Sequence, residues 1–332
     1  MWRLLVDTGP DESWPALKTR LAQIPANTAG RRKIDLAIIS HIDHDHIGGA
    51  AKLFSDRELG LSFGDVWFNA PQVKTIRGVA EGRSLAKLLG AAGSNLPWNK
   101  AWGGRHAVGT ADAPFVELPR RAGAPRLTLL SPSPQSLAAL FKVWDRELAR
   151  LAASDEPAPL EAIASRGRST LDLEALSARK TAVDRAPANG SSIAVLLEHK
   201  GVSVLLGADA YPTVLVPALK ALAAHRGETL PLRVDVFKLS HHGSRANVTI
   251  DLLKAVQAQH YIVSTNGSIF GHPDDEAIAR VILGGGDKPV LWFNYSTART
   301  DKWAASDIQK RFKFEAHVPN DDSRGARLEI EP

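Results

Sequence analysis

Residues 41–49, with the sequence HIDHDHIGG, place five potential metal ligands in six consecutive positions and follow them with two glycines. Residues 34–40 before them are mostly apolar and predict a buried strand, whereas residues 50–54 after them predict the start of a helix. The cluster is therefore expected on a strand-to-helix turn, where side chains converge. Core packing does not require so many imidazoles and carboxylates together, so the turn predicts a site for one or two divalent cations.

The order of the residues within this cluster suits metal binding. His41 and Asp43 share a face if the turn is extended, because alternate residues point to the same side. Asp45 and His46 are adjacent, so the chain must bend for both to reach an ion, and the two glycines that follow permit a tight turn. The alternative is a solvated acidic and His-rich loop, since short motifs also match by chance.

Composition limits the ligand chemistry and the class of protein. The chain has 332 residues, 44% hydrophobic and 23% charged, as in soluble globular proteins, and it has no cysteine. Disulfides and thiolate-bound zinc are therefore excluded, and a site built from nitrogen and oxygen admits Mn²⁺ beside Zn²⁺. The net charge of +5 favours anionic substrates, including nucleic acid, although the charges are mixed along the chain.

The sequence contains no apolar run of transmembrane length, and its first residues enter a strand without the apolar region of a signal peptide. A cytoplasmic protein is expected, and the absence of cysteine is compatible with that location. The length allows two domains or one large α/β domain.

Strand and helix signals alternate in both halves, which predicts a layered α/β sandwich. Residues 192–198 and 202–206 flank a short turn and predict a hairpin. The segment 152–188 is loop-like with short Ala- and Leu-rich pieces, and we interpret it as an insertion that either covers the site or forms a surface excursion. Other strands are expected over residues 4–6, 34–39, 66–69, 127–130, 234–239, 260–264 and 290–293, and helices over 14–24, 85–92, 136–151, 211–225, 250–258, 274–283 and 303–312.

Two clusters in the second half follow expected strands. Asp209 comes just after residues 202–206, and its carboxylate can bridge two cations, although alone it would suit an ordinary turn. His241 and His242 follow the strand 234–239, so that one imidazole can bind metal while the other donates a proton. The alternative is that backbone carbonyls satisfy both rings.

Two further polar groups are candidates for binding substrate. His272 precedes Pro273, which is expected to begin the next helix and to place His272 near a helix N-terminus, where anions bind. Asn189 precedes the hairpin and can hold an oxyanion or a ligand carboxylate. The alternatives are an incidental His in a capping turn and a plain β-turn.

The pattern His41-x-Asp43-x-Asp45-His46 resembles the His-x-His-x-Asp-His motif of the metallo-β-lactamase superfamily. With Asp at the second position it is similar to the extracytoplasmic domain of ComEC-type competence proteins, which take up DNA through a membrane channel. The resemblance spans nearly the whole chain outside 152–188 and implies one domain over residues 1–332, a four-layer αββα sandwich with metals at one edge of its sheets. Counterparts of that subgroup's other motifs follow in order at residues 6–9, 189–192, 207–209, 238–244 and 271–273.

The resemblance also implies a role for each candidate residue. Asp7 would orient the cluster from behind the ligands. His272 would bind substrate phosphate, assist proton transfer or complete the coordination. Asp45 or an imidazole of the pair His241 and His242 could move the proton, with Asp45, His241 and His272 as the catalytic candidates, and Asn189, Ser244 and His272 are the candidates for binding substrate. The first metal would be held by His41, Asp43 and Asp209, and the second by Asp45, His46, Asp209 and one of His241 and His242.

The chain departs from the family pattern at two points. The separate third His of the family has only His106 as a candidate, so the first metal is expected to be loosely held, exchangeable or absent. The family also has strands before the position of Asp7, so either the recorded start is too late or the first hairpin is reduced.

The expected reaction is hydrolysis by a metal-activated water, and the leading expectation is a phosphodiesterase or nuclease that uses one or two Zn or Mn ions and acts on DNA or RNA. The positive charge and the competence-type resemblance favour a nucleic acid or another phosphodiester as substrate, and no protein partner is predicted. The alternatives are a small-molecule hydrolase of the same fold, such as a lactonase, thioesterase or small phosphodiesterase, and a degenerate metal-binding regulatory module.

Overall fold

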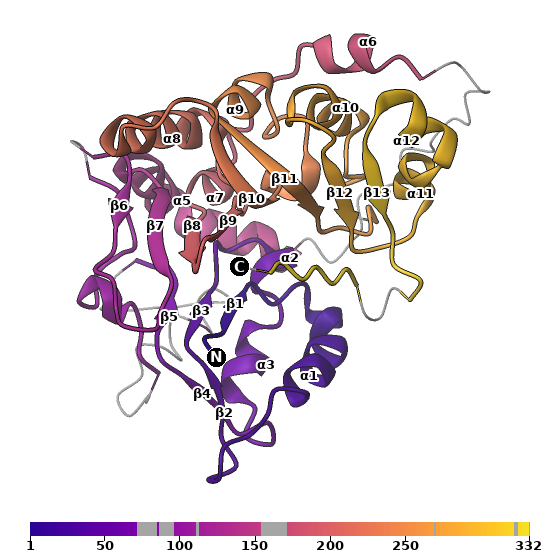
Figure 1. The fold of residues 1–332 in the computed structure, drawn as a ribbon. Coiled ribbons are helices and arrows are strands. Elements are labelled where there is room, and N and C mark those ends of the chain that lie inside the picture. Colours follow the sequence, from indigo (N-terminus) through magenta and orange to yellow (C-terminus); the bar gives the residue numbers. More distant parts are fainter. Residues whose placement is uncertain are drawn as a thin grey trace.

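A computed structural model describes residues 1–71, 85, 96–110, 113–153, 171–268, 270–321 and 325–331 (Figure 1). Residues 86–92 of the expected helix 85–92 and residues 154–170 of the expected insertion lie outside these residues. The centre is an eight-stranded mixed sheet with the order β13-β12-β11-β10-β9-β8-β7-β6. Its strands are β6 (Val116–Glu117), β7 (Arg126–Ser131), β8 (Ala194–His199), β9 (Val202–Leu206), β10 (Leu232–Lys238), β11 (Val256–Val263), β12 (Val290–Phe293) and β13 (Glu315–His317).

Strands β9 to β13 are parallel to one another, whereas β8 forms the expected antiparallel hairpin with β9, and β7 and β6 continue antiparallel. A smaller parallel sheet has the order β1-β3-β5, and a separate parallel pair joins β2 and β4. These five strands are β1 (Leu4–Val6), β2 (Arg32–Ile34), β3 (Leu36–Ile38), β4 (Leu61–Phe63) and β5 (Val66–Trp67).

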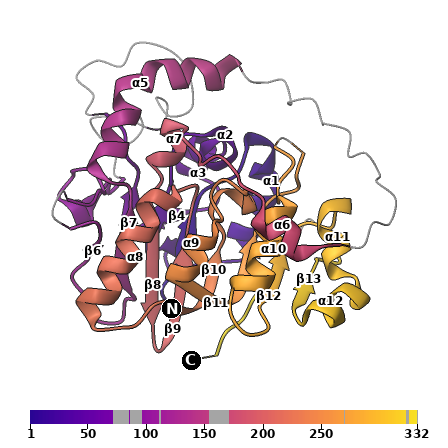
Figure 2. The same cartoon turned by 90° about the horizontal axis from the view of Figure 1, so that it is seen from above.

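Helices cover the two sheets, and a third core joins them. Helices α8 (Pro212–Arg226), α9 (Ile250–Ala255) and α10 (Asp275–Gly284) lie over one face of the large sheet (Figure 2). Helices α1 (Trp14–Ala22) and α3 (Ala50–Ser55) pack against the first part of the chain. Ile38 and Trp67 of the small sheet meet Leu129 and Val195 of the large one in a buried cluster. The protein is therefore mixed α/β, as expected.

The remaining helices are short or peripheral. No helix of the described residues is long and apolar enough to cross a bilayer. These remaining helices are α2 (His44–Ile47), α5 (Pro134–Ala153), α6 (Leu173–Ala178), α7 (Pro187–Gly190), α11 (Ala298–Ala304) and α12 (Ser306–Phe312). The 3-10 turns are η1 (Asp11–Ser13), η2 (Lys100–Trp102) and η3 (Ser240–Gly243).

Several expected elements differ from those observed. The expected strand 34–39 is divided between β2 and β3, which belong to different sheets. The expected helix 303–312 is two helices, because Ala305 takes an extended conformation between them. The expected helix 250–258 ends at Ala255, where the β-branched Val256 begins β11. Pro273 does not begin α10, which starts at Asp275 after the extended Asp274.

The topology explains why the polar motifs meet. Asp7 follows β1, and residues 41–46 follow the parallel neighbour β3. Asp209, His241 and the described residues of 264–268 and 270–273 follow β9, β10 and β11, which are parallel neighbours in the large sheet. The carboxyl ends of parallel strands lie at one edge of a sheet, so the two sheets bring their loops to one edge of the molecule.

Candidate metal centre

Asp7 ties the two strand ends of the small sheet together. Its backbone is left-handed, with φ 59°, which turns the carboxylate back toward the loop after β3. Asp7 Oδ1 accepts from Ser40 N (2.7 Å), and Oδ2 accepts from Ser40 Oγ (2.9 Å) and His46 Nδ1 (2.7 Å). Burial raises the pKa of Asp7, but the opposing effect of His46 and His41 is larger. The net shift of the pKa is therefore downward, and the carboxylate is ionised.

His46 and His242 each turn their Nε2 atom toward the other ring. His46 donates from Nδ1 to Asp7, and His242 donates from Nδ1 to the Ser264 carbonyl oxygen at 2.6 Å. These bonds fix the tautomer and leave the Nε2 lone pairs free. The two Nε2 atoms are 3.0 Å apart. Two lone pairs at this distance repel each other unless a proton or a cation lies between them.

Two carboxylates complete this arrangement. Asp45 Oδ2 lies 3.0 Å from His242 Nε2 and 3.8 Å from His46 Nε2. Asp209 contributes Oδ1, 3.3 Å from His46 Nε2, and Oδ2, 3.8 Å from His242 Nε2. Tetrahedral zinc with ligands at roughly 2.0–2.1 Å separates them by roughly 3.3 Å. Asp45, His46 and His242 offer ligand atoms that lie within 4.8 Å of one another, and Asp209 Oδ1 lies beside this group, 3.3 Å from His46 Nε2. These four residues, here called the four-ligand set, are the candidate site for one divalent ion.

The charges of the four-ligand set also favour a cation. Burial raises the pKa of Asp209, but the imidazoles around it lower the pKa more, to well below its usual value. The pKa of Asp45 is likewise lowered, chiefly by His46 and His242 against its burial. Burial lowers the pKa of His46, whereas Asp209, Asp45 and Asp7 raise it well above 6.5. Two ionised carboxylates in a buried site thus attract either a proton or a metal ion.

His41 and Asp43 form a second, sparser group beside it. Ser40 Oγ already donates to Asp7, so it accepts from His41 Nδ1 at 3.0 Å. His41 Nε2 is buried, and none of the described residues gives it a hydrogen-bond partner. It lies 3.5 Å from Asp43 Oδ2 and 3.9 Å from Asp209 Oδ2. An unsatisfied buried ring nitrogen beside two carboxylates fits a second ion with fewer protein ligands.

His241 is held by residues outside the motifs that the sequence singled out. Its Nδ1 lies 3.1 Å from Asp184 Oδ2 and 3.0 Å from Asn247 Oδ1, while its Nε2 lies 3.7 Å from Asp209 Oδ2. Burial lowers the pKa of His241, but the Asp184 bond and the Asp209 charge raise it to about 9. Asn189 Nδ2 also donates to Asp184 at 2.7 Å. Asp184 falls in the segment interpreted as an insertion, and no motif marks it.

Arg280 on α10 anchors the segment that carries Asp184. It is 4% exposed, and it donates to the backbone carbonyls of Ser177 (3.2 Å) and Arg179 (2.7 Å). The same guanidinium donates to the carbonyls of Arg245 (2.7 Å) and Val248 (3.0 Å), which follow the His pair. Arg280 therefore joins the chain before Asp184 to the chain after His242.

Other residues that sequence reasoning considered have different surroundings. His272 Nδ1 lies 3.4 Å from Asp274 Oδ2, and its ring lies 5.1 Å from that of His241. Ser244 Oγ accepts from the amide of Ala246 at 3.2 Å, within its own turn. His106 donates from Nε2 to the Ala70 carbonyl at 2.7 Å and packs against Phe141. Neither group of described residues that could hold a metal ion, His41–His46–Asp209 or Asp45–His46–His242, includes His106.

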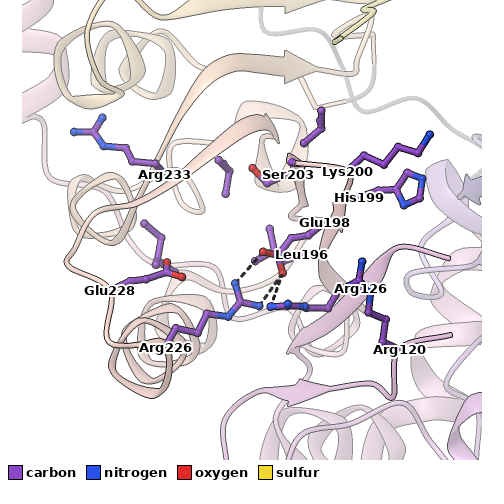
Figure 3. Close-up of a pocket in the computed structure, with 14 residues that line it drawn as sticks. Arg120, Arg126, Leu196, Glu198, His199, Lys200, Ser203, Arg226, Glu228 and Arg233 are labelled. Carbon is purple, nitrogen blue, oxygen red and sulfur yellow. Dashed lines mark hydrogen bonds and ion pairs between the residues drawn. The ribbon is translucent and has the colours of Figure 1, made fainter. Parts of the chain in front are cut away.

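A pocket of about 310 Å³ lies at the other end of the sheet, around the β8–β9 hairpin (Figure 3). Of the cationic residues that line it, Arg226 binds Glu117 and Glu198 at 2.7 Å each. None of the predicted site residues lines it. We interpret its ion pairs as structural.

Residues 3–58 match the model of the metallo-beta-lactamase superfamily. That span contains Asp7 and the whole cluster 41–46. His41, Asp45 and His46 of this cluster form groups that could hold a metal ion together with Asp209 and His242, which lie outside the span. Members of this superfamily are typically hydrolytic metalloenzymes that bind divalent metals. No curated protein matches the chain. The match and the ligand groups together indicate a metal-dependent hydrolase.

Proposed function

We propose that this protein is a metal-dependent phosphodiesterase or nuclease that acts on DNA or RNA. The observation that carries the proposal is the four-ligand set, in which two imidazole nitrogens face each other at 3.0 Å between two ionised carboxylates. A divalent ion held there would supply a nucleophilic water near neutral pH and stabilise charge on the phosphoryl oxygens. Either Zn or Mn suits these nitrogen and oxygen ligands.

The ligand roles follow the geometry around each residue. His242 belongs to the four-ligand set, whereas His241 faces Asp184 through Nδ1 and the centre through Nε2. His241 would therefore move a proton or contact substrate, and Asp184 would orient it. Asp45 would be a ligand first and a proton acceptor second. His41 and Asp43 would hold a second ion more weakly than the first.

Substrate contacts are assigned to residues at the same edge. His272 lies beside His241 and would contact a substrate oxygen. Asn189 Oδ1 is buried with no partner among the described residues, so this carbonyl group would accept a bond from substrate or from a water. Ser244 would support substrate binding by shaping the turn that directly follows His241 and His242. The net charge of +5 supports a polyanionic substrate.

The finer family assignment is also a proposal. The Asp at position 43 supports a ComEC-type member with the four-layer αββα arrangement, built as one domain with an insertion at 152–188. A cytoplasmic location is proposed on the same sequence grounds.

The test is an assay of the purified protein with Mn²⁺ or Zn²⁺ on single-stranded DNA, duplex DNA, RNA and bis-p-nitrophenyl phosphate. The control combines Asp45→Ala with His46→Ala, which removes two of the four ligands. We expect metal-dependent cleavage of nucleic acid that disappears in the control. Cleavage that persists in the control would remove the four-ligand set from the mechanism, and cleavage of bis-p-nitrophenyl phosphate alone would favour a small phosphodiesterase.

A further inference from the structure

A series of neighbouring rings connects the metal centre to an exposed aromatic side chain. The ring of His241 lies 5.1 Å from that of His272, edge to face, and the ring of His272 lies 6.2 Å from that of Phe270 at an interplanar angle of 29°. His241 Nε2 is 3.7 Å from Asp209 Oδ2. The three rings therefore form one path from Asp209, a proposed metal ligand, to the molecular surface.

Phe270 is unusually placed for an apolar residue. The residue is 59% exposed, and it is the one exposed Phe, Trp or Tyr within the described part of the chain. Burying an aromatic ring is favourable, so a chain that leaves one open at the mouth of a polar site gains nothing in stability from it. The ring lies near-parallel to that of His272, and more than half of the residue remains exposed.

A cation lies over the same loop. Gly267 and Gly271 both have positive φ, and a methyl group at Gly271 would lie 3.0 Å from Arg299 Nη2. One at Gly267 would lie 3.2 Å from Arg299 Cδ. The absence of side chains at both glycines thus lets the Arg299 side chain lie flat against the loop that carries Phe270 and His272.

We propose that Phe270, His272 and Arg299 form a binding surface for single-stranded nucleic acid, on which one base stacks on Phe270 and Arg299 contacts a backbone phosphate. This inference rests on the proposed function and names the form of its substrate. Aromatic stacking beside a cation recognises unpaired bases of any sequence, because every base has a π-face. A duplex keeps its bases stacked on one another and offers none to Phe270.

Strand binding is measured by fluorescence anisotropy with a labelled phosphorothioate oligothymidylate, so that turnover does not interfere. Phe270→Ala is expected to weaken binding roughly 5- to 100-fold, the range of one base–aromatic stack. Phe270→Trp is expected to retain it. Leu283→Ala, at an apolar residue that is 48% exposed on α10, is the matched control and is expected to bind like the unmodified protein.

Two further arms identify what is recognised. An abasic oligonucleotide is expected to bind weakly and to be insensitive to Phe270→Ala. Arg299→Gln is expected to reduce the slope of log affinity against log salt by about 0.7, the value for one phosphate of a single strand, whereas Arg311→Gln on α12 is expected to leave it unchanged.

Equal affinity of Phe270→Ala and the unmodified protein would overturn the proposal, as would a preference for duplex or an equal loss with the abasic strand. Because binding is read without cleavage, a protein that binds strands but cleaves nothing would refute the proposed hydrolysis and leave this surface standing. Cleavage that is insensitive to Phe270→Ala, together with unchanged binding, would refute the surface alone.

Discussion

Replacing Arg280 by methionine tests whether Arg280 anchors the segment that carries Asp184, as the structure indicates. Methionine fills a similar apolar volume but donates no hydrogen bond. The change removes a buried bond to the Val248 carbonyl and three half-buried bonds to the carbonyls of Ser177, Arg179 and Arg245. At roughly 2 kcal/mol for the buried charged bond and roughly 0.5 kcal/mol for each acceptor that regains water, the loss is about 3–4 kcal/mol.

The assay is urea unfolding of the metal-free protein, together with hydrogen exchange of the amides between Thr181 and Ala186. We expect a lower free energy of unfolding for Arg280→Met and faster exchange in this segment. The control is Arg179→Met, because the Arg179 side chain is 58% exposed and forms one ion pair with Glu276, which contributes less than about 1 kcal/mol. Equal stability of Arg280→Met and Arg179→Met would refute the reasoning.

Three further predictions address the site and the pocket. Asp7→Asn is expected to weaken metal affinity about 10- to 100-fold, as outer hydrogen-bond partners of metal ligands do, measured by competition with a chelator dye. Because the pKa of His241 is raised to about 9, its contribution to stability is present below pH 6.5 and is lost as pH rises through about 9. Asp184→Asn is therefore expected to destabilise the metal-free protein at pH 6 and much less at pH 10, by urea unfolding at both pH values. Arg226→Met is expected to cost about 1–3 kcal/mol in the same assay, because it leaves two half-buried carboxylates facing each other; an unchanged midpoint would contradict that.

Local patterns were sufficient to predict the strands that deliver the motifs. The strand 4–6 and the hairpin around residues 199–201 were predicted correctly. Short apolar runs that are bounded by Gly or polar residues usually form strands. The second part of the cluster is helical from His44 to Ile47, so His44 points to the Asp11 amide and away from His46. An extended turn, as expected from the sequence, would not separate the two rings in this way.

Contacts that depend on tertiary structure were not predictable. Asp184 lies 57 residues from His241 in a segment without a motif, and only the fold brings them to 3.1 Å. The choice between His241 and His242 was also open, because adjacent residues carry the same side chain. Their left-handed backbones, with φ 47° and 54°, send one ring to Asp184 and the other to Asp45.

Anomalous diffraction from crystals grown with Zn²⁺ or Mn²⁺ tests the metal centre most directly. The structure predicts a peak bonded to the Nε2 atoms of His46 and His242 and to carboxylate oxygens of Asp45 and Asp209. Crystals that contain the metal but show no peak between these four side chains, or show it elsewhere, would contradict the assignment.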